Sequence, residues 1–86
     1  MTSKTVTVGS AVGLHARPAA IIAEKAAELS APVTLSKDGG MAVDASSALM
    51  IMTLGAKQGA EVVVTSDDPA VLEQIAGMVA QDLDAD

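Results

Sequence analysis

The chain contains no Phe, Tyr or Trp, although half of its 86 residues are apolar. Its core must therefore be built from Val, Ile, Leu, Met and many Ala. Small side chains fill an interior only where backbones approach each other closely, so we expect closely packed helices. A chain of this length forms one small core and is too short for two ordinary domains, so we expect a single domain over residues 1–86.

The charge and the hydropathy pattern exclude several classes of protein. Eleven acidic residues against five basic ones give a net charge of −6, which repels nucleic acid. No apolar run approaches the roughly 20 residues that a membrane-spanning helix needs, so we expect no membrane insertion. The N-terminal residues do not resemble a secretory signal, and the chain has no Cys. These features predict a cytoplasmic protein.

The first third of the chain predicts a strand followed by a helix. Residues 2–8 alternate, with Val6 and Val8 on one face, which is the period of a half-buried strand. From Ala16 to about Leu29, apolar residues recur at helical spacing. The residues expected on the buried face of this helix are Ala19, Ile22, Ala23, Ala26 and Leu29.

The middle of the chain predicts a hairpin and a short helix. Val33 and Leu35 alternate with polar residues before the turn residues 37–40, and residues 41–43 are expected to pair back as a short strand. Ser46 and Ser47 offer an N-cap for a helix over residues 48–54, which Gly55 would end.

The last third predicts a strand and a third helix. Residues 61–65 are apolar enough that we expect a strand buried on both faces. Asp67, Asp68 and Pro69 then form the start of a helix whose apolar stripe comprises Leu72, Ile75, Ala76, Val79 and Leu83. The resulting order is βαββαβα, an α+β fold with one sheet face covered and the other wet.

The single histidine stands at the junction of a loop and the first helix. His15 follows Gly13 and Leu14, and Pro18 falls in the first helical turn, where its missing N–H costs little. The first amides of a helix form an anion site, here the amides of Ala16 and Arg17. Taken alone, a histidine near a helix start is more often an ordinary solvated residue. With a cation beside it, His15 is a candidate nucleophile for a phosphoryl group, which the amides and Arg17 would stabilise.

The octapeptide Gly-Leu-His-Ala-Arg-Pro-Ala-Ala at residues 13–20 resembles the active-site segment of the HPr family of phosphocarrier proteins of sugar phosphotransferase systems. Residues 43–55 and 59–61 resemble a second region of that family, and the element order also matches. The resemblance covers essentially the whole chain. It implies an HPr-like open-faced β-sandwich, in which a four-stranded antiparallel sheet carries three helices on one face.

The resemblance also implies a function and partners. Enzyme I, charged from phosphoenolpyruvate, would phosphorylate His15 on Nδ1, and the carrier would pass the phosphoryl group to sugar-specific IIA domains. In some members a serine kinase phosphorylates the serine that begins the second helix, which corresponds to Ser47. Many regulated members carry a Lys just before that serine, whereas this chain has Ser46. A transcriptional regulator is a further partner that the resemblance implies.

The short second helix is nearly apolar all round, so one sheet face cannot bury all of its side chains. We expect the exposed ones to dock partner proteins, and methionine suits such a surface because its thioether adapts to several partners. The candidate docking residues are Leu49, Met50, Met52 and Leu54. A carrier needs its small docking face free, so we expect a monomer.

Two other functions remain as alternatives. A regulatory paralogue from a nitrogen-linked branch would share the fold but not the role in sugar uptake. An acyl carrier protein is also small and acidic, and residues 44–47 before an apolar helix are faintly similar to its serine attachment site, but acyl carriers lack the strands expected here. The sequence has no Walker A loop and no metal-binding motif. We therefore expect no cofactor and a carrier rather than an autonomous enzyme.

Overall fold

The computed structural model describes residues 2–10, 13–29, 31–37 and 40–81, and all structural statements below concern these residues. The elements follow the order predicted from the sequence. They are β1 (Thr2–Thr7), α1 (Ala16–Glu28), β2 (Val33–Lys37), β3 (Val43–Asp44), α2 (Ala48–Thr53), β4 (Glu61–Ser66) and α3 (Pro69–Ala80).

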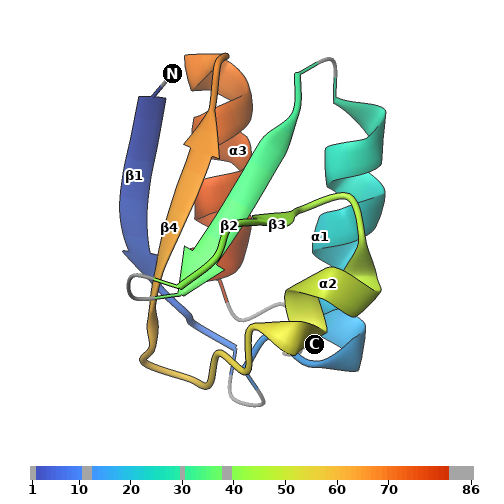
Figure 1. Cartoon of the computed structure of the whole chain (residues 1–86), viewed down its shortest axis with the longest axis vertical. Coiled ribbons are helices and arrows are strands. Elements are labelled where there is room, and N and C mark those ends of the chain that lie inside the picture. Colours follow the sequence, from blue (N-terminus) through green and yellow to red (C-terminus); the bar gives the residue numbers. More distant parts are fainter. Residues whose placement is uncertain (1, 11–12, 30, 38–39, 82–86) are drawn as a thin grey trace.

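The four strands form one antiparallel sheet in the order β1-β4-β2-β3 (Figure 1). Strand β4 is central and pairs on both sides, so Val63 lies opposite Thr5 in β1 and opposite Ser36 in β2. Strand β3 is a two-residue edge strand in which Asp44 lies opposite Thr34. The crossovers bring the chain segments that precede α1 and β4 to the same end of the sheet (Figure 1).

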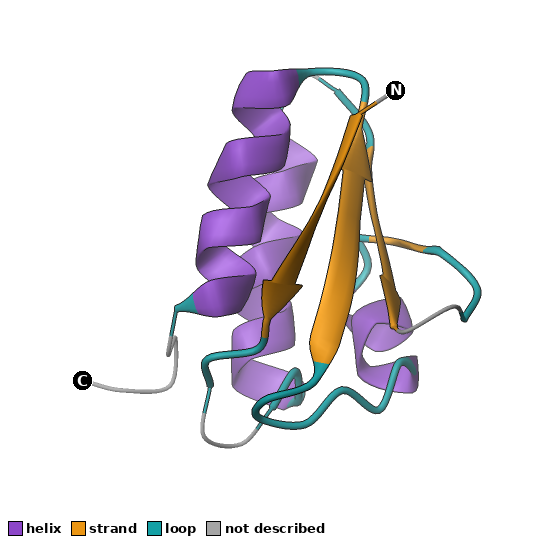
Figure 2. Ribbon diagram, turned by 90° about the vertical axis from the view of Figure 1, so that its left-hand side faces the viewer, coloured by secondary structure: helices purple, strands orange, loops and turns teal. Residues whose placement is uncertain are grey.

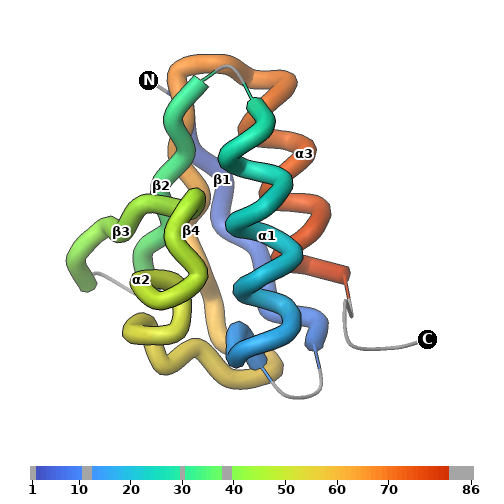
Figure 3. The backbone as a smooth tube through the Cα atoms, turned by 90° about the vertical axis from the view of Figure 1, so that its right-hand side faces the viewer, coloured from blue at the N-terminus to red at the C-terminus, as the bar shows by residue number. Residues whose placement is uncertain are grey.

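Helices α1 and α3 lie side by side as a layer on one face of the sheet, and the other face is open (Figure 2). Helix α2 packs against α1 and β3, close to the N-terminal half of α1 (Figure 3). This arrangement confirms the predicted open-faced sandwich. Alanines occupy much of the interface between helices and sheet, as the lack of aromatic residues predicted; the buried ones are Ala19, Ala23, Ala26, Ala45, Ala56 and Ala76.

The helix boundaries follow from local chemistry. The Asp68 carboxylate accepts a hydrogen bond of 2.9 Å from the Ala70 amide, and Pro69 occupies the first position of α3. The Ser47 hydroxyl accepts from the Met50 amide at 3.3 Å, which caps α2. Gly55 follows α2 with a φ of +65°, the left-handed conformation typical of a helix stop. Among the described helices, none is both long and apolar enough to span a bilayer.

Several details differ from the sequence-based expectations, among them Leu29, which is the half-buried C-cap residue after α1 rather than part of its buried face. Strand β3 covers Val43–Asp44 rather than residues 41–43, and Met41 is 86% exposed because it precedes the ladder. Strand β4 is not buried on both faces: Val62 and Val64 face the helices, whereas Val63 is half-buried on the open face. Helix α3 also buries Val71, which the predicted stripe omitted, and Leu83 lies outside the described residues.

Candidate functional site

His15 is the N-cap residue of α1, with an extended backbone (φ −98°, ψ −161°). Its carbonyl accepts the first helical hydrogen bond, 2.9 Å from the Ala19 amide. Its side chain makes no capping hydrogen bond, and the residue is exposed. The backbone of His15 therefore serves the helix while the imidazole faces solvent.

The first turn of α1, directly after His15, has several features that favour binding of an anion. The amides of Ala16 and Arg17 precede the first i→i−4 bond, at the positive end of the helix dipole. Arg17 is exposed, and α1 has no acidic residue in its first turn. Pro18 is buried, so it anchors this turn to the core without contributing an N–H. The structure thus places His15, Ala16 and Arg17 at the cap and in the first turn of α1.

The loop before His15 is fixed against the loop that follows α2. The Leu14 amide donates a hydrogen bond of 2.9 Å to the Ala56 carbonyl, and the Leu14 side chain is buried. Gly13 has a φ of +74°, and a Cβ at this position would collide with the Ala56 carbonyl oxygen. Glycine is therefore required here both by conformation and by the close approach of a second backbone.

The same loop also contacts the C-terminal end of α3. The Gly9 amide donates a hydrogen bond of 3.1 Å to the Val79 carbonyl, and a Cβ on Gly9 would collide with the Ala80 carbonyl oxygen. The Ser10 carbonyl accepts from the Gly13 amide at 3.0 Å, while the buried Ser10 hydroxyl has no partner in the described part of the chain. The segment that presents His15 is thus held by two neighbouring elements.

Helix α2 exposes apolar side chains near the start of α1. Leu49 is 70% exposed and Met50 is 42% exposed, whereas Ile51 is fully buried. Met52 and Leu54 are half-buried and pack against the core. The four candidate docking residues therefore differ in how far their side chains are exposed to solvent. Leu49 and Met50 are the two most exposed of the four.

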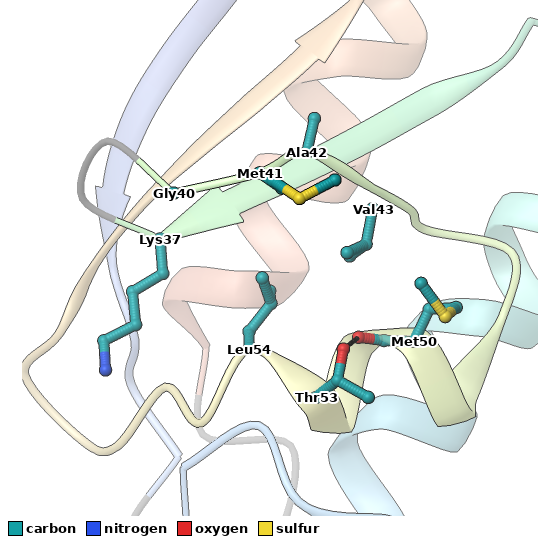
Figure 4. A pocket seen from close by; sticks show the side chains of 8 residues that line it. All are labelled: Lys37, Gly40, Met41, Ala42, Val43, Met50, Thr53 and Leu54. Carbon is teal, nitrogen blue, oxygen red and sulfur yellow. Dashed lines mark hydrogen bonds between the residues drawn. The ribbon is translucent and has the colours of Figure 1, made fainter.

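A groove of about 640 Å³ lies between α2 and the segment leading into β3 (Figure 4). Met41 and Met50 point into it from opposite sides, and the Lys37 ammonium lies at one end, 3.4 Å from the Gly55 carbonyl oxygen. Neither His15 nor Arg17 lines this groove. It is therefore separate from the histidine site.

The two serines before α2 have different partners. Ser47 caps the helix, whereas Ser46 donates two hydrogen bonds to the Asp44 carboxylate, from its amide at 2.9 Å and from its hydroxyl at 2.7 Å. These bonds, first that of the amide and then that of the hydroxyl, hold the pKa of Asp44 below its usual range. Of the two candidate caps, only Ser47 acts on α2.

The described residues contain no cluster of three or more His, Asp or Glu side chains suited to a metal ion. The described residues define a small α+β protein with an exposed histidine at the start of a helix and an exposed arginine in the first turn of that helix.

Comparison with known proteins identifies the family. A family model described as "PTS HPr component phosphorylation site" matches residues 2–81, so the chain belongs to the HPr family of phosphocarrier proteins. It is 44% identical to phosphocarrier protein HPr of Streptomyces coelicolor, over 98% of this chain and 94% of that protein. It is 31% identical to phosphocarrier protein NPr of Klebsiella oxytoca, over 90% of this chain and 86% of that protein.

A solved structure supports the same assignment. The crystal structure of a phosphocarrier protein HPr from Bacillus anthracis matches with a TM-score of 0.83 and 33% identity, covering 91% of this chain and 95% of that one. The predicted family and fold are both confirmed.

The sequence did not indicate the contact between the His15 loop and residues 56–57. Ala56 and Lys57 are distant from His15 in sequence, and neither belongs to a pattern with an obvious chemical role. The one feature of the sequence that marked this loop was its two glycines, Gly55 and Gly59. Both have positive φ values in the structure.

Proposed function

We propose that this chain accepts a phosphoryl group on Nδ1 of His15 from phosphorylated enzyme I and passes it to sugar-specific IIA domains. The observation that carries the proposal is the exposed imidazole at the start of α1, in a chain of the HPr family. The confirmed family role as a phosphotransferase-system phosphocarrier supports these partners.

In the proposed step, the lone pair of Nδ1 attacks phosphorus. A nitrogen–phosphorus bond forms while the bond from phosphorus to the donor breaks, and that electron pair leaves with the donor. The phosphorylated product carries negative charge close to the start of α1. There the amides of Ala16 and Arg17 and the Arg17 guanidinium can stabilise it by donating hydrogen bonds. Positioning and charge stabilisation are the main requirements of phosphoryl transfer, and the partner enzymes would supply the rest. The chain therefore acts as a carrier rather than an autonomous enzyme.

In this proposal, enzyme I and the IIA domains dock on the face formed by the start of α1 and the exposed side of α2. Leu49 and Met50 supply apolar contact area there. A carrier must bind two kinds of partner and release both, and a small adaptable surface suits that requirement. The same argument favours a monomer.

Regulation at Ser47 is a separate part of the proposal. Its hydroxyl is half-buried and caps α2. A phosphate on it would add negative charge next to Leu49 and Met50 and would oppose docking of enzyme I. A serine kinase and a transcriptional regulator would be the corresponding partners. Ser47→Asp should then slow phosphorylation of His15 by enzyme I, whereas Ser46→Asp, at the exposed neighbouring position, should have a smaller effect.

A second candidate is the nitrogen-linked branch, which the 31% identity to an NPr supports. The higher identity to an HPr favours sugar transport. The discriminating experiment loads the protein from enzyme I and phosphoenolpyruvate and then adds a sugar-specific IIA domain. Transfer to that domain and on to sugar is the expected result. Loading without onward transfer to any sugar IIA domain would favour the nitrogen-linked role.

A further inference from the structure

Lys57 lies directly against the turn that leads into His15. Gly13 packs so closely on this region that a Cβ added to it would come 2.8 Å from the Lys57 Cα atom. The neighbouring Ala56 carbonyl accepts the hydrogen bond of the Leu14 amide at 2.9 Å. Residues 13–14 and 56–57 therefore form one continuous backbone contact, and Lys57 is exposed next to it.

The loop that carries Lys57 is fixed at several points. The Ala60 amide donates to the Lys57 carbonyl at 2.9 Å, and the Gly59 amide donates to the Val8 carbonyl at 3.0 Å. The Val8 amide in turn donates to the Ala60 carbonyl at 2.9 Å. Because these bonds hold the loop to the end of β1, the position of the Lys57 backbone relative to His15 is set by the fold.

Lys57 also differs from the other lysines in its surroundings. Lys4 forms an ion pair with Glu73 at 2.9 Å, Lys25 lies 3.9 Å from Glu28, and Lys37 donates to a backbone carbonyl. No salt bridge to Lys57 occurs within the described ranges. Among the described residues, no carboxylate therefore pairs with the Lys57 ammonium, in a chain whose net charge is −6.

The distances permit this charge to act on a phosphoryl group at His15. The Lys57 Cα atom lies against Gly13, and Gly13 and His15 are two residues apart, so the Cα atoms of Gly13 and His15 are separated by at most about 7.6 Å. The four-carbon stem of a lysine spans much of that distance. The ammonium can therefore come within about one Debye length, ~8 Å at physiological salt, of a group on the imidazole.

We propose that Lys57 is a second cation of the histidine site, in addition to Arg17, and that it stabilises the phosphorylated form of His15. This inference rests on the proposed phosphorylation of His15. It assigns to the loop after α2 an electrostatic role in addition to its structural one. Gly13 is the residue that makes the role possible, because any side chain there would separate the two loops.

The test is a competition for phosphoryl groups at equilibrium. Equal amounts of wild type and Lys57→Gln are mixed with a small amount of phosphoenolpyruvate and catalytic enzyme I, and intact mass gives the phosphorylated fraction of each. Because enzyme I equilibrates both proteins, the ratio reports the stability of the phosphorylated form and not the rate of docking. At low salt we expect the wild type to hold the phosphoryl group about two- to five-fold more often. The preference should largely vanish at 1 M salt, where the Debye length is about 3 Å.

Two variants control for charge and for structure. Lys4→Gln removes the same net charge from β1, where Lys4 pairs with Glu73, and should share phosphoryl groups equally with the wild type. Lys57→Arg keeps the positive charge and should restore the wild-type ratio at low salt. Equal sharing between wild type and Lys57→Gln at low salt, or an equal loss in Lys4→Gln, overturns the role of Lys57. A mixture in which no protein gains a phosphoryl group overturns the proposed function itself, and with it this inference.

Discussion

The Leu14 amide and the Ala56 carbonyl oxygen are joined by a hydrogen bond of 2.9 Å, which ties the loop carrying His15 to the loop that follows α2. The side chain of Leu14 is buried beneath this contact. The imidazole next to it is therefore exposed on a backbone that has little freedom to move. A backbone held in this way would suit the proposed phosphoryl acceptor, because phosphoryl transfer depends mainly on positioning.

Gly13→Ala should destabilise the protein by about 1–3 kcal/mol, because it combines a positive φ with a collision against Ala56. Urea unfolding measures the change. Gly77→Ala is the matched control, since Gly77 is an exposed helical glycine with open space around its Cβ position. That control should be stabilised by about 0.4–1 kcal/mol. Equal stability of Gly13→Ala and wild type would show that the two loops can move apart to make room for a side chain at residue 13.

Arg17→Ala should slow phosphoryl acceptance from enzyme I, because it removes a charge-assisted hydrogen bond to the proposed phosphohistidine. The expected loss in kcat/KM corresponds to about 1.5–3 kcal/mol. Stopped-time intact mass measurements give the rate. Arg17→Lys keeps the charge without the planar fork and should recover only part of the loss. A rate unchanged in Arg17→Ala would remove Arg17 from the mechanism.

Met50→Asp should raise the KM for enzyme I by about tenfold or more while the fold is retained, because it places a charge in an apolar contact and Met50 is already 42% exposed. Met41→Asp is the control. Met41 is 86% exposed in the segment before β3, across the groove from Met50, and does not belong to α1 or α2, which form the proposed docking face. A KM for enzyme I that is unchanged in Met50→Asp would mean that this part of α2 does not contact enzyme I.

Asp44→Ala should lower stability at neutral pH by less than about 1 kcal/mol, since the carboxylate is exposed. The pKa of folded Asp44 lies below its unfolded value of about 3.9, so its contribution is present above that pH and is lost as the pH falls through the folded pKa. Wild type and variant should therefore differ most above about pH 5 and converge in acid. Ser46→Ala, which keeps the amide donor, should show a smaller difference at neutral pH. A difference that grows in acid would contradict this assignment.

The order of the elements could be predicted because the local signals were strong. The helical spacing of Ala19, Ile22 and Ala26 and the acidic cap at Asp68 both correspond to observed features. The core is built from aliphatic residues and many alanines, as the absence of aromatic residues predicted. The candidate site could be predicted around His15 because its chemistry lies in one contiguous segment at a helix start.

The details that could not be predicted depend on contacts distant in sequence. The open face of the sheet explains why Val63 is only half-buried, and an apolar run such as residues 61–65 does not show which faces are covered. The approach of Lys57 to Gly13 depends on how the loops after β1 and α2 pack together. Local periodicity contains no information about such a contact.

Phosphorylation of His15 is the central claim, and intact mass with the His15→Ala variant tests it most directly. Wild type and variant are incubated with enzyme I, magnesium and phosphoenolpyruvate, and a sample of each is then treated briefly with acid. We predict that the wild type gains one phosphoryl group, that acid removes it, and that the variant gains none while unfolding with the same urea midpoint. An acid-stable gain, or the same gain in His15→Ala, would contradict the assignment of His15 as the phosphoryl acceptor.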